Sequence, residues 1–281
     1  EYIDDPITFK GAAEAIFEFN RRIIEAVCEY IPGIKVQIAY YEMYGLPGIE
    51  AFMSTCQYAK DKGLVVIGDV KRNDIGSTAK AYANAYLGET NLIVDSKCAF
   101  DLDFITVNPY LGIDGVLPFI DACKKYNKGI FTLVKTSNPS SSDFQDLYIG
   151  EHMLYEVVAQ NVSKWGEELI GKRGYSAVGA VVGATHPEQA EELRKSMPHT
   201  YFLVPGYGAQ GGGADDICGC FDNQGLGAVI NASRGIICAY RGDRRREEFV
   251  PDQFDKAALA EVIAMRDDIN SALQKNDKIY W

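Results

Sequence analysis

The feature that most constrains this chain is an alternation of short apolar runs with helical patterns. Seven runs are each followed by a Gly, Pro, Asn or Asp cluster and then by helically spaced apolar residues; they cover residues 35–40, 64–70, 104–108, 129–136, 178–184, 201–205 and 228–232. The runs are largely apolar on both faces, which is typical of strands in a parallel sheet covered by helices. The pattern predicts an α/β fold, either an open doubly wound sheet or a closed (β/α)8 barrel.

Motifs and length favour the barrel. No G-x-G-x-x-G follows the first run and no G-x-x-x-x-G-K-[ST] occurs, so the two nucleotide-binding forms of the open sheet lose support. Seven strand–helix units in 281 residues are close to the roughly 250 residues of a typical (β/α)8 barrel, and no linker or low-complexity stretch interrupts them. We therefore expect a single TIM-barrel domain spanning residues 1–281.

The pattern supplies seven strands where a closed barrel needs eight. The chain opens on a helical pattern over residues 11–31, which Pro32 and Gly33 end, and only a polar, Pro-containing segment precedes it. We therefore expect that the first strand of the barrel is absent from this sequence. Residues 88–100 and 150–151 also interrupt the alternation, and we interpret them as candidate joins where further sequence is missing.

Composition and charge exclude several classes of protein. The chain is 47% hydrophobic and has no apolar stretch near the roughly 18 residues of a membrane-spanning helix, so no membrane partner is expected. A net charge of −11 makes nucleic acid an unfavourable partner. An odd number of cysteines, seven, and the absence of C-x-x-C indicate reduced thiols and a cytoplasmic protein. Three scattered histidines without H-E-x-x-H give no sign of a metal site, so we expect chemistry without metal.

The densest polar cluster follows the second run. Side chains alternate along a strand, so Asp69 and Lys71 point to the same side, toward the mouth of the predicted barrel. Neighbouring carboxylates favour the ammonium form of a lysine, which makes Lys71 a candidate proton donor. Asp74 lies past the strand end and could reach the same region or a neighbouring subunit. The alternative is an ordinary solvated turn between strand and helix.

A second cluster spans the last two runs. Residues 205–213 are rich in glycine, whose backbone N–H groups can approach an anion closely, and Gln210 could donate an amide hydrogen. Arg234 follows the next run with a guanidinium suited to phosphate. Loops after strands seven and eight are where barrels bind phosphate. We therefore expect a phosphate site, although a flexible surface loop would also explain the glycines.

Other candidates carry weaker signals. Lys35 begins a run that is unusually polar, so it points either into the barrel or to solvent. Ser137, Asn138 and Asn108 follow other runs and could line the site or form turns. Thr185 and Glu188 match a capping box, so the intervening His186 is interpreted as structural.

Five motifs together resemble the orotidine 5′-phosphate decarboxylase family in its longer bacterial form. They are Asp69-x-Lys71-x-x-Asp74 with the following Ile75-Gly76-Ser77-Thr78, Lys35 to Glu42, Thr136 to Pro139, Val204 to Gly211, and Asn231 to Gly235. The resemblance runs from about residue 12 to residue 240. The first motif alone would also fit sugar-phosphate decarboxylases and synthases of the same superfamily.

The resemblance implies that CO2 is removed from orotidylate to give uridylate, by a homodimer with shared active sites and without a metal or organic cofactor. It implies that Lys71 protonates C6 of the pyrimidine, that Asp69 lies against the departing carboxylate, and that Lys35 joins them and contacts ribose. Asp74 and Thr78 would enter the partner's site. Ser137 would bind the pyrimidine, and the remaining substrate-binding candidates are Asn108, Tyr207, Gln210, Gly211, Arg234 and Gly235.

One departure and two alternatives accompany the resemblance. The first strand of the family ends in an Asp that contacts ribose, whereas this sequence has only Asp4 and Asp5 in the segment that would follow such a strand. The alternatives are a Mg2+-dependent sugar-phosphate decarboxylase or synthase of the same superfamily and a catalytically inactive phosphate-binding barrel. Ser137 and the loop around Tyr207 and Gln210 argue against the first alternative.

Overall fold

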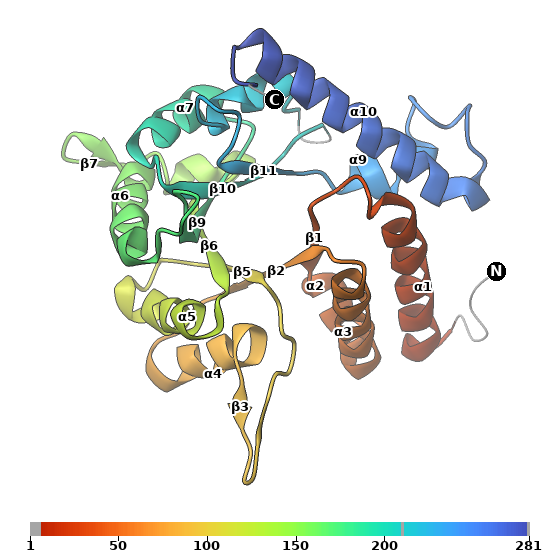
Figure 1. Ribbon diagram of the computed structural model, residues 1–281, viewed down its shortest axis with the longest axis horizontal. Helices are drawn as coiled ribbons and strands as arrows, with labels where there is room; N and C mark the ends of the chain where they lie inside the picture. The colour runs from red at the N-terminus through yellow and green to blue at the C-terminus, as the bar shows by residue number, and fades with distance from the viewer. Residues whose placement is uncertain (1–6, 209–210, 280–281) are drawn as a thin grey trace.

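The molecule is built around a seven-stranded parallel sheet that curves into a nearly closed barrel with helices outside (Figure 1). The computed structural model describes residues 7–208 and 211–279. The seven strands, in their order around the sheet, are β1 (Gly33–Gln37), β2 (Val65–Arg72), β5 (Phe104–Val107), β6 (Gly129–Lys135), β9 (Ser176–Val182), β10 (Thr200–Pro205) and β11 (Ala228–Asn231).

The order of strands follows the chain, so each connection carries a helix back over the outside of the sheet. The helices are α1 (Phe9–Val27), α2 (Ala39–Glu42), α3 (Gly45–Asp61), α4 (Gly76–Leu87), α5 (Ile113–Tyr126), α6 (Leu154–Gly166), α7 (Pro187–Ser196), α8 (Ala214–Ile217), α9 (Arg234–Ile237) and α10 (Phe254–Lys275). Neighbouring strands are parallel and in register at residues such as Gln37 and Asp69, which face each other across β1 and β2.

The barrel is not closed by hydrogen bonds. β1 and β11 are the two ends of the sheet, and no strand among the described residues pairs with both of them. This arrangement agrees with the prediction of a TIM barrel that lacks one strand. No described helix is long and apolar enough to cross a membrane.

Alternating side chains of the strands form two apolar layers. Ile67, Phe131, Val181 and Leu203 are buried together inside the barrel. The opposite faces of the same strands pack against the helices in a larger core. Because Asp69 is two residues after Ile67 on β2, its side chain also points into the interior of the barrel, near the carboxyl end of the strand.

The structure corrects one strand boundary. The run over residues 35–40 is a strand only to Gln37, because the chain turns into α2 directly afterwards. The two stretches interpreted as candidate joins lie in hairpins, β3 (Thr90–Asn91) with β4 (Ser96–Lys97) and β7 (Tyr148–Ile149) with β8 (His152–Met153). The turn of the second hairpin is two residues long, and Gly150 adopts a φ of 65° that glycine accepts readily.

The predicted capping box at Thr185 is also wrong. Helix α7 begins at Pro187, which places His186 at the N-cap position without a side-chain capping bond. Proline is well suited to the first helical position because it has no N–H to satisfy. The Thr185 hydroxyl instead donates to the backbone oxygen of Ser137 at 3.4 Å.

Candidate active site

A cavity of about 530 Å³ opens at the carboxyl ends of the barrel strands. Eighteen residues line it, and they come from all seven strands and from loops that follow them: Lys35, Asp69, Lys71, Thr106, Leu133, Thr136, Ser137, Asn138, Gln145, Val181, Leu203, Pro205, Gly206, Tyr207, Asn231, Ala232, Ser233 and Arg234. Carboxyl ends of barrel strands are the usual position of active sites in this fold.

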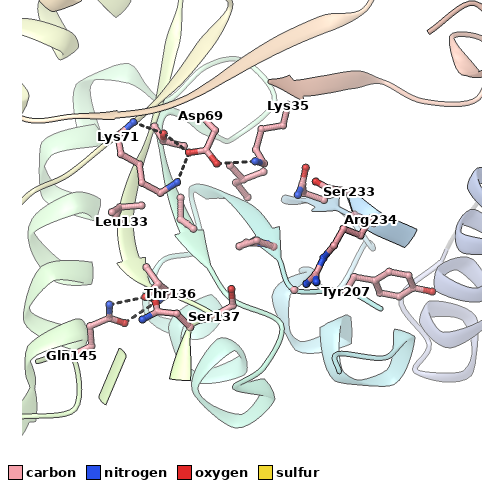
Figure 2. Close-up of a pocket in the computed structure, with 18 residues that line it drawn as sticks. Lys35, Asp69, Lys71, Leu133, Thr136, Ser137, Gln145, Tyr207, Ser233 and Arg234 are labelled. Carbon is pink, nitrogen blue, oxygen red and sulfur yellow. Dashed lines mark hydrogen bonds and ion pairs between the residues drawn. The ribbon is translucent and has the colours of Figure 1, made fainter. Parts of the chain in front are cut away.

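A carboxylate between two ammonium groups forms one end of the cavity. Asp69 is 7% exposed, and its two carboxylate oxygens contact Lys35 Nζ at 2.7 Å and Lys71 Nζ at 2.5 Å. Figure 2 shows the two lysines on opposite sides of the carboxylate. Lys35 comes from β1 and the other two residues from β2, so the pairing of these two strands assembles the cluster. Of the two orientations that the sequence left open for Lys35, the structure shows the inward one.

The two lysines decide the ionisation of Asp69. Burial by itself raises the pKa of a carboxyl group, but the ion pairs with Lys35 and Lys71 outweigh it, and the pKa of Asp69 lies below its ordinary value. The carboxylate is therefore ionised at neutral pH and faces two cations. The cluster can stabilise a negative charge that develops beside the ammonium groups and can repel a second carboxylate placed next to Asp69.

The loop after β6 forms a polar wall. Gln145 accepts a hydrogen bond from the backbone N–H of Thr136 at 2.9 Å and donates one to the Thr136 hydroxyl at 2.8 Å. The Thr136 hydroxyl donates to Asn138 Oδ1 at 2.6 Å. These bonds fix the backbone on both sides of Ser137, whose side chain lines the cavity (Figure 2).

The other end of the cavity holds Tyr207 and Arg234. The Tyr207 hydroxyl donates to Asp268 of α10 at 2.6 Å, and burial together with this bond raises the pKa of the phenol. Arg234 is exposed, and its guanidinium has no hydrogen bond or ion pair with the described residues. A guanidinium at the rim of a cavity can bind an incoming anion such as a phosphate.

Five predicted residues lie outside the cavity lining. Asp74 is half-buried and accepts a hydrogen bond from the backbone N–H of Ile75, and Thr78 is exposed on α4. The side chain of Asn108 accepts a bond from the backbone N–H of Tyr110 and so forms a turn. Gly211 and Gly235 do not contribute to the lining either.

The predicted residue Gln210 lies outside the described residues. Among the described residues, no group of three or more His, Cys, Asp or Glu side chains is arranged to hold a metal ion.

Several polar residues that line the cavity were not candidates from the sequence. They are Thr106, Thr136, Gln145, Asn231 and Ser233. Asn231 ends β11 and Ser233 follows it, so their positions carried a usable signal. Thr106 lies within an apolar strand and Gln145 lies ten residues beyond β6, and neither position is marked by a local pattern.

Known proteins resemble this chain in sequence over most of its length. The model of the orotidine 5′-phosphate decarboxylase / HUMPS family matches residues 14–247. An orotidine 5′-phosphate decarboxylase of Caldicellulosiruptor bescii is 48% identical over 92% of this chain and 83% of its own length. The enzyme of the same name from Clostridium novyi is 41% identical over 93% of this chain and 86% of its own length.

A solved structure shows the same fold. The orotidylate decarboxylase of Leishmania donovani superposes with a TM-score of 0.70 at 31% identity, covering 93% of this chain and 90% of its own. A family match over most of the chain, close relatives of one name and a shared barrel give a single conclusion. The chain belongs to the orotidine 5′-phosphate decarboxylase family, whose named enzymes are carboxy-lyases of uridylate synthesis.

Proposed function

We propose that this chain releases CO2 from orotidine 5′-phosphate and that the Lys71 ammonium protonates the carbon left behind. The observation that carries the proposal is the buried Asp69 carboxylate held between Lys35 and Lys71 at the inner end of the cavity. Direct decarboxylation leaves a carbanion at C6 of the pyrimidine. A fixed ammonium beside C6 stabilises charge that appears only in the transition state, and such interactions accelerate the chemical step.

Asp69 would act on the substrate carboxylate. A carboxylate of the substrate placed beside the ionised Asp69 is repelled, and the repulsion disappears as CO2 leaves without charge. Lys35 would keep Asp69 ionised and hold its orientation through the 2.7 Å ion pair. The proton that Lys71 gives to C6 completes the uridylate product.

The rest of the cavity would hold the nucleotide. Ser137 lies in the polar wall after β6, where its hydroxyl could hydrogen-bond the edge of the pyrimidine. Arg234 lies at the rim with no partner among residues 7–208 and 211–279, which suits capture of the 5′-phosphate. Tyr207, Gln210, Gly211 and Gly235 belong to the two loops on that side. Phosphate contacts far from the reacting carbon could drive closure of those loops.

The decisive experiment is the decay of the ultraviolet absorbance of orotidylate with purified protein. We expect turnover that a chelator does not change. Loss of turnover with chelator would favour a Mg2+-dependent sugar-phosphate enzyme of the same superfamily. Binding of uridylate in a calorimeter without any decay of orotidylate would favour an inactive phosphate-binding barrel.

We also propose a homodimer in which Asp74 and Thr78 complete the partner's site. Both residues lie outside their own chain's cavity lining, although they follow β2, the strand that carries Asp69 and Lys71. Large exposed apolar side chains lie around them, Ile75 at 54% and Leu111 at 44% exposure, and a covered face would remove them from water.

Subunit exchange tests the dimer. Lys71→Ala and Asp74→Ala chains are each expected to be nearly inactive, but a mixed dimer would contain one site with its own Lys71 and the partner's intact Asp74. Mixing equal amounts should restore about half the sites of each mixed dimer, following the reciprocity of a two-fold interface. Confirmed exchange without recovered activity would show that Asp74 acts within its own chain.

The cellular compartment and the number of domains belong to the same proposal. All seven cysteines are free, which supports the proposal that the protein works in the reducing cytoplasm. The continuous order of strands around one sheet supports a single domain over the chain. Intact-mass analysis after thiol alkylation of protein from its native cells would show seven alkylated cysteines if the thiols are reduced there.

A further inference from the structure

The hydroxyl of Thr106 hydrogen-bonds to three groups of β2, the strand that carries Asp69 and Lys71. Thr106 lies on β5 and is 1% exposed. Its Oγ1 accepts hydrogen bonds from the backbone N–H groups of Val70 and Lys71, each at 3.0 Å, and donates to Asp69 Oδ1 at 3.0 Å. A hydroxyl has one proton to donate and two lone pairs to accept with, so these three bonds use its full capacity.

The strand that carries Asp69 and Lys71 is irregular at this point. Gly68 faces Ile105 and Arg72 faces Val107, so β2 advances four residues while β5 advances two. The two extra residues on β2 form a bulge, and bulges commonly redirect side chains beside active sites. Lys71 has a φ of 43°, in the left-handed region that a residue with a side chain adopts only at a cost.

Thr106 provides hydrogen bonds that the backbone of this bulge does not form with the backbone of β5. Inside the bulge the N–H groups of Val70 and Lys71 have no ladder partner on β5, and both donate to the Thr106 hydroxyl oxygen instead. The oxygen of Asp69 that receives the Thr106 proton is the one that contacts Lys71 Nζ at 2.5 Å. One side chain therefore holds the backbone of Lys71 and the carboxylate to which its ammonium is bound.

We infer that Thr106 is a positioning residue, which holds the Lys71 bulge and the Asp69 carboxylate so that the ammonium is aimed before substrate binds. The inference rests on the proposed function, because Lys71 and Asp69 are the groups proposed to react. It predicts that the hydroxyl contributes to the chemical step and not to affinity for the nucleotide.

The neighbouring strand offers a matched control. Thr132 lies on β6 opposite Val107 and is 0% exposed, and its hydroxyl has no hydrogen-bond partner in the described part of the chain. Thr132→Val and Thr106→Val make the same change of atoms in two equally buried strand threonines. Only the second removes hydrogen bonds, because valine keeps the shape of threonine but has no hydroxyl.

The test compares Thr106→Val, Thr106→Ser and Thr132→Val in the full chain. Orotidylate turnover gives kcat and KM, and calorimetry gives the Kd of uridylate. We expect Thr106→Val to lower kcat at least 30-fold while the Kd of uridylate stays within threefold of wild type. Thr106→Ser, which keeps the hydroxyl, should recover kcat to within threefold, and Thr132→Val should stay within twofold.

A kcat of Thr106→Val within threefold of wild type would overturn the inference, as would a Thr106→Ser chain as slow as Thr106→Val. If circular dichroism shows that Thr106→Val does not fold, Thr106→Ala replaces it. The alanine and serine variants both lack the methyl group and differ only in the hydroxyl, so equal kcat values for the two would overturn the inference.

A crystal structure separates this inference from the proposed function. In Thr106→Val the contact between Lys71 Nζ and Asp69 should be lost, whereas Thr132→Val should retain it. A retained contact in Thr106→Val would contradict the positioning role even if the wild-type chain decarboxylates orotidylate. A wild-type chain without turnover would contradict the proposed function, while the two crystal structures would still decide whether Thr106 positions Lys71.

Discussion

The two ends of the cavity hold their charged groups in different ways. At the inner end, Asp69 is buried and contacts two ammonium groups within 2.7 Å, and a buried threonine hydroxyl adds a third bond. At the rim, Arg234 is exposed, and the structure shows no hydrogen bond or ion pair from it to any described residue. One end is assembled before substrate arrives, and the other keeps its cation in solvent.

This difference matches what each end has to do. A group that stabilises charge in a transition state works best when it is already oriented, because no reorganisation then accompanies the reaction. A group that captures an anion from water can remain solvated until the anion arrives, and its binding energy can then close a loop. We therefore assign the chemical step to the inner end and substrate capture to the rim.

The largest effect should come from Lys71→Ala. Removing one preorganised group that stabilises developing charge commonly costs 10²–10³ in kcat, and here the proton donor is lost as well, so we expect a loss on the order of 10³-fold or more. Single-turnover decay of orotidylate absorbance measures it, with circular dichroism to confirm the fold. A loss below tenfold would remove Lys71 from the chemical step.

Arg234→Ala should have the next largest effect, and only on substrates that carry phosphate. Charge-assisted hydrogen bonds contribute about 1.5–3 kcal/mol each, so losing the guanidinium should lower kcat/KM for orotidylate by roughly 100-fold. Decarboxylation of orotidine, which has no phosphate, should change less than about threefold. Arg241→Ala, in an exposed arginine outside the cavity lining, is the control. Equal losses for both substrates would contradict a phosphate role.

Gly183→Ala, which disturbs the polar wall after β6, should have a smaller effect, on stability and on uridylate binding. A Cβ at Gly183 would lie 2.9 Å from the Cα, Cβ and backbone N of Ser137, so the loop after β6 must move. We expect the free energy of unfolding to fall by about 1–3 kcal/mol and the Kd of uridylate to rise, as measured by urea unfolding and calorimetry. In Gly171→Ala the new Cβ would meet only Tyr175 O, at 3.6 Å, and both quantities should stay near wild type.

The smallest effect should appear in the pH dependence of stability. Since the folded-state pKa of Asp69 is lowered by its two lysines, ionised Asp69 stabilises the fold fully above its unfolded pKa of about 3.9 and progressively less as the pH falls through the folded value. Urea unfolding of wild type and Asp69→Asn should give a constant difference in free energy between pH 7 and 5. Below about pH 4 the difference should shift in favour of Asn, and a constant difference down to pH 3 would contradict the assignment.

The sequence allowed the strands and much of the site to be predicted, because these depend on local periodicity. Two-residue alternation alone places Asp69 and Lys71 on one side of a strand, and Arg234 follows a strand end as expected. The bulge at Lys71 and the hydrogen bonds that the Thr106 hydroxyl makes to it could not be predicted, because they depend on the pairing of β2 with β5. Gln145 reaches the cavity only through its bonds to Thr136 across a loop, which no pattern marks.

Calorimetric titration of uridylate into the Lys71→Ala and Arg234→Ala chains tests the division between the two ends most directly. We expect Lys71→Ala to leave the Kd within about threefold of wild type and Arg234→Ala to raise it roughly 100-fold, the factor expected for the loss of charge-assisted phosphate bonds. If Lys71→Ala weakens uridylate binding as strongly as Arg234→Ala, or if Arg234→Ala leaves the Kd unchanged, the two ends do not divide chemistry and capture between them.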